Sequence, residues 1–293
     1  GPRPRAAGSR LSGTPACPYR PLSGLPPLPE GPLEGYAIGI LHVAGMRSSA
    51  SAARLTKDVV GLYHIDFVID TGDLTDLGTS FEAPYASTYL PLSVPYIWID
   101  GNHDTPAIAK TMQSIPGVTV LDNQFTNIGG IEIGGFPDPA SRNISPQPSS
   151  DPTQAAEATR IASLVDFHGP RAFIAAVHDP KQAARLDGKV AVVVDGHTHR
   201  QGIEVRNGTV FLDAGSTGGG GFRSFNQNGE SPSSLQVLYV RKDPLKLVAV
   251  DTVTIYGFSQ EFSVIRRVFT PDEGLMRETG VLDSSIIFTD ISA

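Results

Sequence analysis

Potential metal ligands follow short apolar runs at several separate points along this sequence. The runs cover residues 67–69, 96–99, 172–177 and 190–194, and the side chains that follow them are Asp73, Asn102, His103, His178, His197 and His199. Short apolar runs bounded by turn residues predict buried strands. Ligands of open α/β sheets bind outside the carboxyl ends of the strands, so we expect these loops to converge on one rim. Carboxylate, amide and imidazole groups together suit a divalent ion such as Mn, Fe or Zn.

The remaining pattern predicts a mixed α/β fold. A near-continuous apolar run over residues 36–43 indicates a strand buried on both faces. Helical spacing over 50–62, 107–113 and 154–167 alternates with the predicted strands, and a late hairpin is expected over 235–253. Residues 1–34 are rich in Pro, Gly, Arg and Ser, which predicts a linker or surface arm before one domain spanning 35–293.

Composition narrows the classes of function. The net charge of -7 gives no strong signal for nucleic-acid binding, which normally needs a basic face. The chain has one cysteine, which rules out an intramolecular disulfide framework and a multi-cysteine zinc site. No apolar run is long enough to span a bilayer, so we expect a soluble chain. It opens with Gly-Pro rather than Met, which suggests a fragment of a larger chain, and its compartment stays open.

Each motif alone has an ordinary explanation, because Gly-Asp and Asn-His pairs are common in turns. The ordered set is more specific. Gly72-Asp73-x-x-Asp76, Gly101-Asn102-His103-Asp104, a single His178 and Gly196-His197-x-His199 resemble the motifs of the calcineurin-like metallophosphoesterases. The resemblance implies a sandwich of two mixed β sheets flanked by helices.

The resemblance also implies roles for the matched residues. Asp73 would bridge two metals, and His199 would belong to the first metal site. The second site would be completed by Asn102, His178 and His197. His103 would lie near the substrate, where it would stabilise charge in the transition state or protonate the leaving oxygen.

The first motif of that family, Asp-x-His, is altered here. Gly45 stands at the aspartate position and Arg47 at the histidine position, so the first metal site would keep only Asp73 and His199. Loss of an outer partner alone costs about 10–100-fold in metal affinity, and loss of two direct ligands should cost more. The fixed charge of Arg47 also repels a cation.

Three interpretations follow. An enzyme with one tightly held ion could use Arg47, and Arg200 beyond it, to hold phosphate oxygens; for Arg200 a solvated surface position is the ordinary alternative. An inactive relative could bind a metal, a phosphate or a partner. A replacement ligand could also come from His42, Asp70 or Asp66. We expect a metal-dependent phosphoric ester hydrolase with one or two ions per chain, acting on a phosphorylated small molecule or a phosphodiester, with the inactive relative as the alternative.

Overall fold

The computed structural model describes residues 38–90, 93–143, 147–170, 172–219, 232–256 and 262–276. The predicted linker over residues 1–34 lies outside this part of the chain. That linker and the domain boundary at residue 35 therefore stay predictions.

The first sheet has seven strands in the order β13-β12-β11-β1-β2-β3-β4. Neighbours from β1 to β4 are parallel, whereas β11 pairs antiparallel with β1 and the next two strands continue antiparallel. The late hairpin expected from the sequence is the β11–β12 pair. The strands are β1 (Ile38–Val43), β2 (Phe67–Asp70), β3 (Tyr96–Trp98), β4 (Val118–Val120), β11 (Ser233–Lys242), β12 (Leu245–Ile255) and β13 (Phe262–Val268).

The second sheet has six strands in the order β5-β6-β7-β8-β10-β9. Its centre, from β6 to β10, is parallel, and each edge adds one antiparallel strand. The strands are β5 (Gln124–Ile128), β6 (Ile131–Phe136), β7 (Ile174–Val177), β8 (Val192–Asp195), β9 (Gly202–Arg206) and β10 (Thr209–Asp213). The two mixed sheets confirm the predicted fold class.

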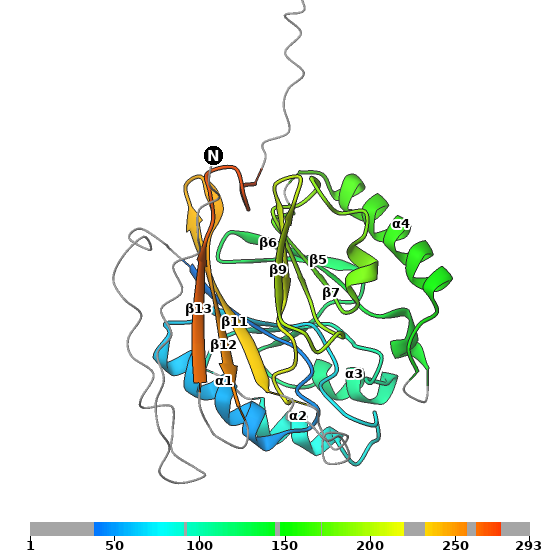
Figure 1. Ribbon diagram of the computed structural model, residues 1–293. Coiled ribbons are helices and arrows are strands. Elements are labelled where there is room, and N and C mark those ends of the chain that lie inside the picture. Colours follow the sequence, from blue (N-terminus) through cyan, green and yellow to red (C-terminus); the bar gives the residue numbers. More distant parts are fainter. Residues whose placement is uncertain are drawn as a thin grey trace, which may run out of the picture.

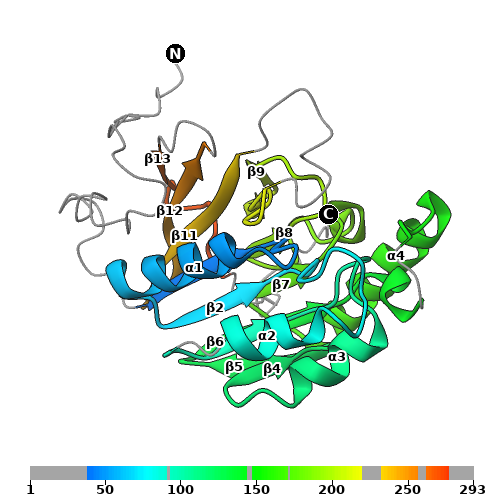
Figure 2. The same ribbon diagram turned by 90° about the horizontal axis from the view of Figure 1, so that it is seen from below.

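Helices cover the outer faces of both sheets. Helices α1 (Ala50–Leu62), α2 (Ala83–Tyr89) and α3 (Pro106–Gln113) pack on the first sheet, and α4 (Asp151–His168) packs on the second. Figures 1 and 2 show α1, α2 and α3 along one side of the molecule and α4 away from them. Two short 3-10 helices, η1 (Pro139–Arg142) and η2 (Pro180–Ala183), also lie within the described residues. Within the described residues, no helix is long and apolar enough to cross a membrane.

The layers explain why the strands are so apolar. An inner core between the sheets contains Ile40, Ile69 and Ile97 of the first sheet and Ile133 and Val192 of the second. Every residue of β1 is buried, since one face meets this core and the other meets the helices. Strands covered on both faces have continuous rather than alternating apolar sequences.

The loops that leave β2 and β3 are tied together by one buried carboxylate. Asp104 Oδ2 accepts the backbone N–H groups of Asp73 (2.8 Å) and Gly101 (3.0 Å), and its Oδ1 accepts that of Thr75 (3.1 Å). Charge-assisted bonds of this kind are stronger than neutral ones, and inside a protein they fix the relative position of both loops. The rim of the first sheet is therefore rigid where the polar motifs begin.

The stability of the fold should depend on pH through Asp70 at the end of β2. Burial raises the pKa of Asp70 to about 8, although Tyr96 and the Gly72 N–H donate to its carboxyl. In the unfolded chain an aspartate has a pKa of about 3.9. Between this pKa and the native one, Asp70 carries a proton in the native state and has lost it in the unfolded state. This contribution to the free energy of unfolding is therefore lost as pH rises through that window.

We expect Asp70→Asn to remove this loss, because an amide can accept from Gly72 and donate to Tyr96 without titrating. Urea denaturation at several pH values from about 5 to 8 gives the free energy of unfolding as a function of pH. The decrease of that free energy with pH should be smaller in Asp70→Asn than in the unmodified chain, by up to about 1.4 kcal/mol per pH unit. Equal slopes would contradict the assignment of Asp70 as a protonated native group.

Candidate metal centre

Side chains from loops that follow four strands meet at the rim shared by the two sheets. Asn102 Oδ1 lies 3.0 Å from His178 Nε2 and 3.0 Å from His197 Nδ1. The two imidazole nitrogens are 3.2 Å apart, and Asp73 Oδ1 is 3.4 Å from His178 Nε2. Ligand atoms of Asp73, His178 and His197 all lie within 4.8 Å of one another. The expected convergence of the loops is therefore present for these residues.

The atoms that face one another here are mainly hydrogen-bond acceptors. His178 Nδ1 lies 2.7 Å from the carbonyl oxygen of Thr71, so it carries the proton in the neutral ring and Nε2 presents a lone pair. That lone pair meets the amide oxygen of Asn102 and the carboxylate of Asp73. Acceptors in such proximity repel unless a proton or a cation lies between them. The oxygen and nitrogen donor set therefore fits a divalent transition metal.

The side chain of Arg47 lies against Asp73 and His199, the two residues that would remain from the first metal site. Its Nη2 lies 2.6 Å from Asp73 Oδ2 and 2.9 Å from His199 Nε2, and its Nη1 is 3.5 Å from Asp76 Oδ1. The side chain is only 5% exposed. The two carboxylate oxygens of Asp73 therefore have different partners. Oδ1 faces the group of Asn102, His178 and His197, called here the histidine cluster, and Oδ2 binds the guanidinium of Arg47.

The charges of this arrangement are consistent with one another. Burial alone would raise the pKa of Asp73, but a protonated His178 and Arg47 outweigh it and hold that pKa well below its usual range. Burial alone would lower the pKa of His178, but Asp73 in turn raises it, so without an ion a proton on His178 takes the place of the cation. Burial of the imidazole and the neighbouring Arg47 charge lower the pKa of His199 to about 4. A neutral His199 ring can therefore accept a hydrogen bond from Arg47 through Nε2.

Backbone strain is concentrated in these loops. Arg47, Asp73, His197 and His199 have φ values of 52°, 58°, 62° and 58°. The left-handed region is uncommon for residues other than glycine, and each such residue costs roughly 1–3 kcal/mol. Strained residues persist where surrounding contacts hold them, and they cluster at functional sites. The strain supports a functional role for this rim independently of the motifs.

His103 and Arg200 occupy different environments. His103 is buried beside the cluster; its backbone N–H donates to Asp73 Oδ1 (2.9 Å), and its Nδ1 lies 2.6 Å from the carbonyl oxygen of Asp76. Arg200 is exposed, and its backbone N–H donates to Thr198 Oγ1. The roles that we expected for these two residues stay predictions.

The alternative ligands considered from the sequence have other partners. The buried His42 ring bonds Gln236 (3.2 Å) and Thr71 (3.3 Å), and Asp66 accepts the N–H of Gly39 (2.7 Å). Asp70 is held by Gly72 and Tyr96 as described above. Burial lowers the pKa of His42 to about 4, as expected for a neutral core histidine.

Sequence reasoning missed three contributions. Asp76 and Asp104 belong to the quoted motifs, but the sequence did not show which groups they bind. Asp76 contacts Arg47, and Asp104 accepts backbone N–H groups of the β2 and β3 loops. Ser216 follows a predicted strand near the same rim, but its contact with the first motif was not predicted: its Oγ donates to the carbonyl oxygen of Gly45 (3.0 Å). A Cβ at position 45 would lie 3.0 Å from this Oγ at a φ of +58°.

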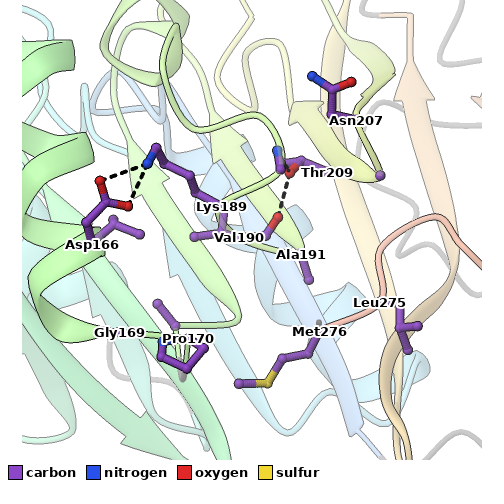
Figure 3. A pocket seen from close by; sticks show the side chains of 14 residues that line it. Asp166, Gly169, Pro170, Lys189, Val190, Ala191, Asn207, Thr209, Leu275 and Met276 are labelled. Atoms are coloured by element: carbon purple, nitrogen blue, oxygen red, sulfur yellow. Dashed lines mark hydrogen bonds and ion pairs between the residues drawn. The ribbon is translucent and has the colours of Figure 1, made fainter. Parts of the chain in front are cut away.

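A separate pocket of about 420 Å³ lies at the other end of the second sheet (Figure 3). Residues just before β7 and just before β8 line it, whereas His178 and His197 follow the opposite ends of these strands. Lys189 Nζ pairs with both carboxylate oxygens of Asp166, at 2.6 and 2.8 Å (Figure 3). This pocket contains none of the predicted site residues.

Comparison with solved structures identifies proteins with a similar fold. TT1561 of Thermus thermophilus matches with a TM-score of 0.54 and 12% identity, over 72% of this chain and 97% of that one. A novel archaeal phosphodiesterase gives 0.46 and 11%, over 74% and 100%. Vacuolar protein sorting 29 from Cryptosporidium parvum gives 0.47 and 14%, over 80% and 99%. A search of curated protein sequences found no match.

The sequence model of one protein family also matches the chain. It is described as calcineurin-like phosphoesterase, and the match covers residues 41–201, more than half of the 293 residues. The matched region includes Arg47 and every residue of the histidine cluster. This match and the two-sheet architecture show that the chain belongs to the calcineurin-like phosphoesterase family.

Proposed function

We propose that this protein hydrolyses phosphoric esters with one divalent metal ion held by Asp73, Asn102, His178 and His197. The observation that carries the proposal is the cluster of oxygen and nitrogen atoms within 3.0–3.4 Å of one another, which needs a proton or a cation between its members and has the donor types that suit a divalent ion. The substrate class is a phosphomonoester or a phosphodiester, as its family indicates.

A divalent ion at such a site supplies Lewis acidity, which acidifies water and polarises a phosphoryl oxygen. The protein residues supply orientation and proton transfer. His103 Nδ1 faces a carbonyl oxygen at 2.6 Å and must donate to it, so Nε2 is the nitrogen that exchanges protons. We assign to His103 the protonation of the leaving oxygen.

We assign to Arg47 the charge that a first metal ion would otherwise provide. Its guanidinium contacts Asp73 and His199, the two side chains that would remain from the first metal site. His199 would then orient Arg47 rather than bind a metal, because its Nε2 lone pair accepts from the guanidinium. Arg200, exposed just beyond His199, would attract the anionic substrate.

A second candidate function is a non-catalytic metal- or phosphate-binding module. The observation that favours it is the burial of Arg47: its Nε is buried and has no hydrogen-bond partner within the described residues. A guanidinium shielded in this way holds its neighbours in place more readily than it reaches a phosphate oxygen. On this hypothesis the remaining ion would stabilise the rim without supporting catalysis.

Metal content tests the proposed ion site. Protein purified without chelator and titrated with Mn²⁺ should bind one ion per chain, and His178→Ala should lose that ion because it removes a central donor. Mass spectrometry of the metal content and isothermal titration calorimetry would measure this. His64→Asn is the matched control, because His64 is an exposed histidine and asparagine tolerates its φ of 48°. Zero or two ions per unmodified chain would contradict the proposed site.

Substitution of Arg47 tests its proposed role in both stability and catalysis. Arg47→Ala removes one partner of a buried ion pair, which should lower the free energy of unfolding by about 3–5 kcal/mol. If Arg47 supplies transition-state charge, hydrolysis of p-nitrophenyl phosphate or bis(p-nitrophenyl) phosphate should fall by about 10²-fold or more. Arg47→Lys keeps the charge without the planar contact and should be intermediate in both measurements.

Arg47→His decides between the two candidate functions. It restores an imidazole beside Asp73 and His199 without the strained Gly45→Asp replacement. An inactive natural chain that gains a second Mn²⁺ and hydrolytic activity through this substitution would establish the binding module. An active natural chain that loses activity on the same substitution would support the role of Arg47 in catalysis.

A further inference from the structure

The two histidines of the proposed ion site use different ring nitrogens. His178 presents Nε2 to Asn102, because its Nδ1 donates to the Thr71 carbonyl oxygen. His197 presents Nδ1 to the same amide oxygen at 3.0 Å. A neutral imidazole has one lone pair, so His197 can bind an ion through Nδ1 only while Nε2 keeps its proton. Something must favour that tautomer.

The group that faces His197 Nε2 is the carboxylate of Asp179, whose Oδ2 lies 3.7 Å away. Asp179 is buried and directly follows His178 in the chain. A carboxylate near one ring nitrogen favours the proton on that nitrogen, and it leaves the other nitrogen as the donor to a metal. His197 is the member of the pair that needs such support, since its side chain is 29% exposed and that of His178 is fully buried.

The Asp179 carboxylate is itself held in place. Its Oδ1 accepts the Lys181 N–H at the start of η2 (2.9 Å), and its Oδ2 accepts from Gln154 Nε2 of α4 (3.3 Å). The backbone N–H groups of His178 and Asp179 both donate to Gln182 Oε1. The carboxylate is therefore fixed relative to both histidines by contacts from α4 and η2.

We propose that Asp179 is a positioning residue that sets the tautomer and the ring orientation of His197, so that Nδ1 is the atom offered to the metal ion. This inference rests on the proposed ion site and adds a residue to it. In this role Asp179 would contact neither the ion nor the substrate. Asp179 would act through His197, and the hydrogen bond from Gln154 holds the Asp179 carboxylate in place.

The test compares the Asp179→Asn variant of the whole 293-residue chain with the unmodified protein by calorimetric titration with Mn²⁺ after metal removal. Asparagine caps helices as well as aspartate does, so the substitution keeps the start of η2 while it removes the charge. We expect one ion per chain in both proteins and a Kd raised about 10–100-fold in the variant. Asp151→Asn is the matched control: it removes an exposed carboxylate that pairs with Lys181, and it should leave the Kd unchanged.

A second readout follows the tautomer directly. Nitrogen-15 NMR of the histidine rings, recorded with Zn²⁺ bound, should show His197 protonated at Nε2 in the unmodified protein and a mixed signal in Asp179→Asn. Asp179→Ser, another helix-capping residue, should behave in the same way if the asparagine variant folds poorly. Thermal unfolding of each metal-free variant separates a folding defect from a binding defect.

The outcomes are distinct. A Kd of Asp179→Asn equal to that of the unmodified protein would overturn the inference and leave the proposed ion site intact. If Mn²⁺ binding were weakened equally in Asp179→Asn and Asp151→Asn, the loss of any nearby negative charge would explain the effect, and the inference would also be overturned. Failure of the unmodified protein to bind Mn²⁺ would overturn both the inference and the proposed function.

Discussion

The structure of the rim depends on how Asp73 divides its two carboxylate oxygens. Oδ2 binds the guanidinium of Arg47 at 2.6 Å, and Oδ1 faces His178 and accepts the backbone N–H of His103. A buried carboxylate cannot remain charged without such partners, because its desolvation costs several kcal/mol. Arg47 therefore allows Asp73 to stay ionised, and an ionised Asp73 is a condition for any cation at the histidine cluster.

The same contact explains why an altered metal motif is compatible with a well-ordered site. A metal ion and a guanidinium both need electron-pair donors around them. Asp73 Oδ2 and His199 Nε2 can serve either one without changing their identity or orientation. If the proposed site is correct, the change at position 47 would replace one cation with another, while the absence of a side chain at Gly45 leaves room for Ser216. In the proposed site, the sequence departs from the family motif at two ligands of the first ion and keeps the two acceptors, Asp73 and His199, that would have shared that ion.

Much of the fold was predictable from the sequence, because its signals are local. Helix α1 was expected over residues 50–62 and is found there, since Ala53, Leu55, Val59 and Val60 repeat with helical spacing on its buried face. Strands covered on both faces gave continuous apolar runs. Convergence of the loops at one rim followed from parallel strands and motif order, and Asn102, His178 and His197 do meet there.

The partners of those residues were not predictable, because each depends on a contact between distant parts of the chain. Arg47 and His199 are separated by 152 positions, and the sequence suggested only that Arg47 would repel a cation or hold a phosphate. His42 was a possible ligand by composition, yet pairing of β1 with β11 brings Gln236 opposite it and makes it a core residue. Side-chain type limits what a residue can bind, whereas sheet pairing decides which of those partners it meets.

One consequence concerns the total charge at the rim. A guanidinium carries one unit of charge where a divalent ion carries two, and it cannot dissociate from the chain. The rim therefore keeps a constant positive charge beside Asp73 whether or not an ion is bound at the histidine cluster. Because the carboxylate of Asp73 compensates the charge of Arg47, the guanidinium repels an ion at the histidine cluster less than an unpaired arginine would. On the proposed arrangement, the buried pair would accommodate one ion at the histidine cluster and exclude another ion from the position of the guanidinium.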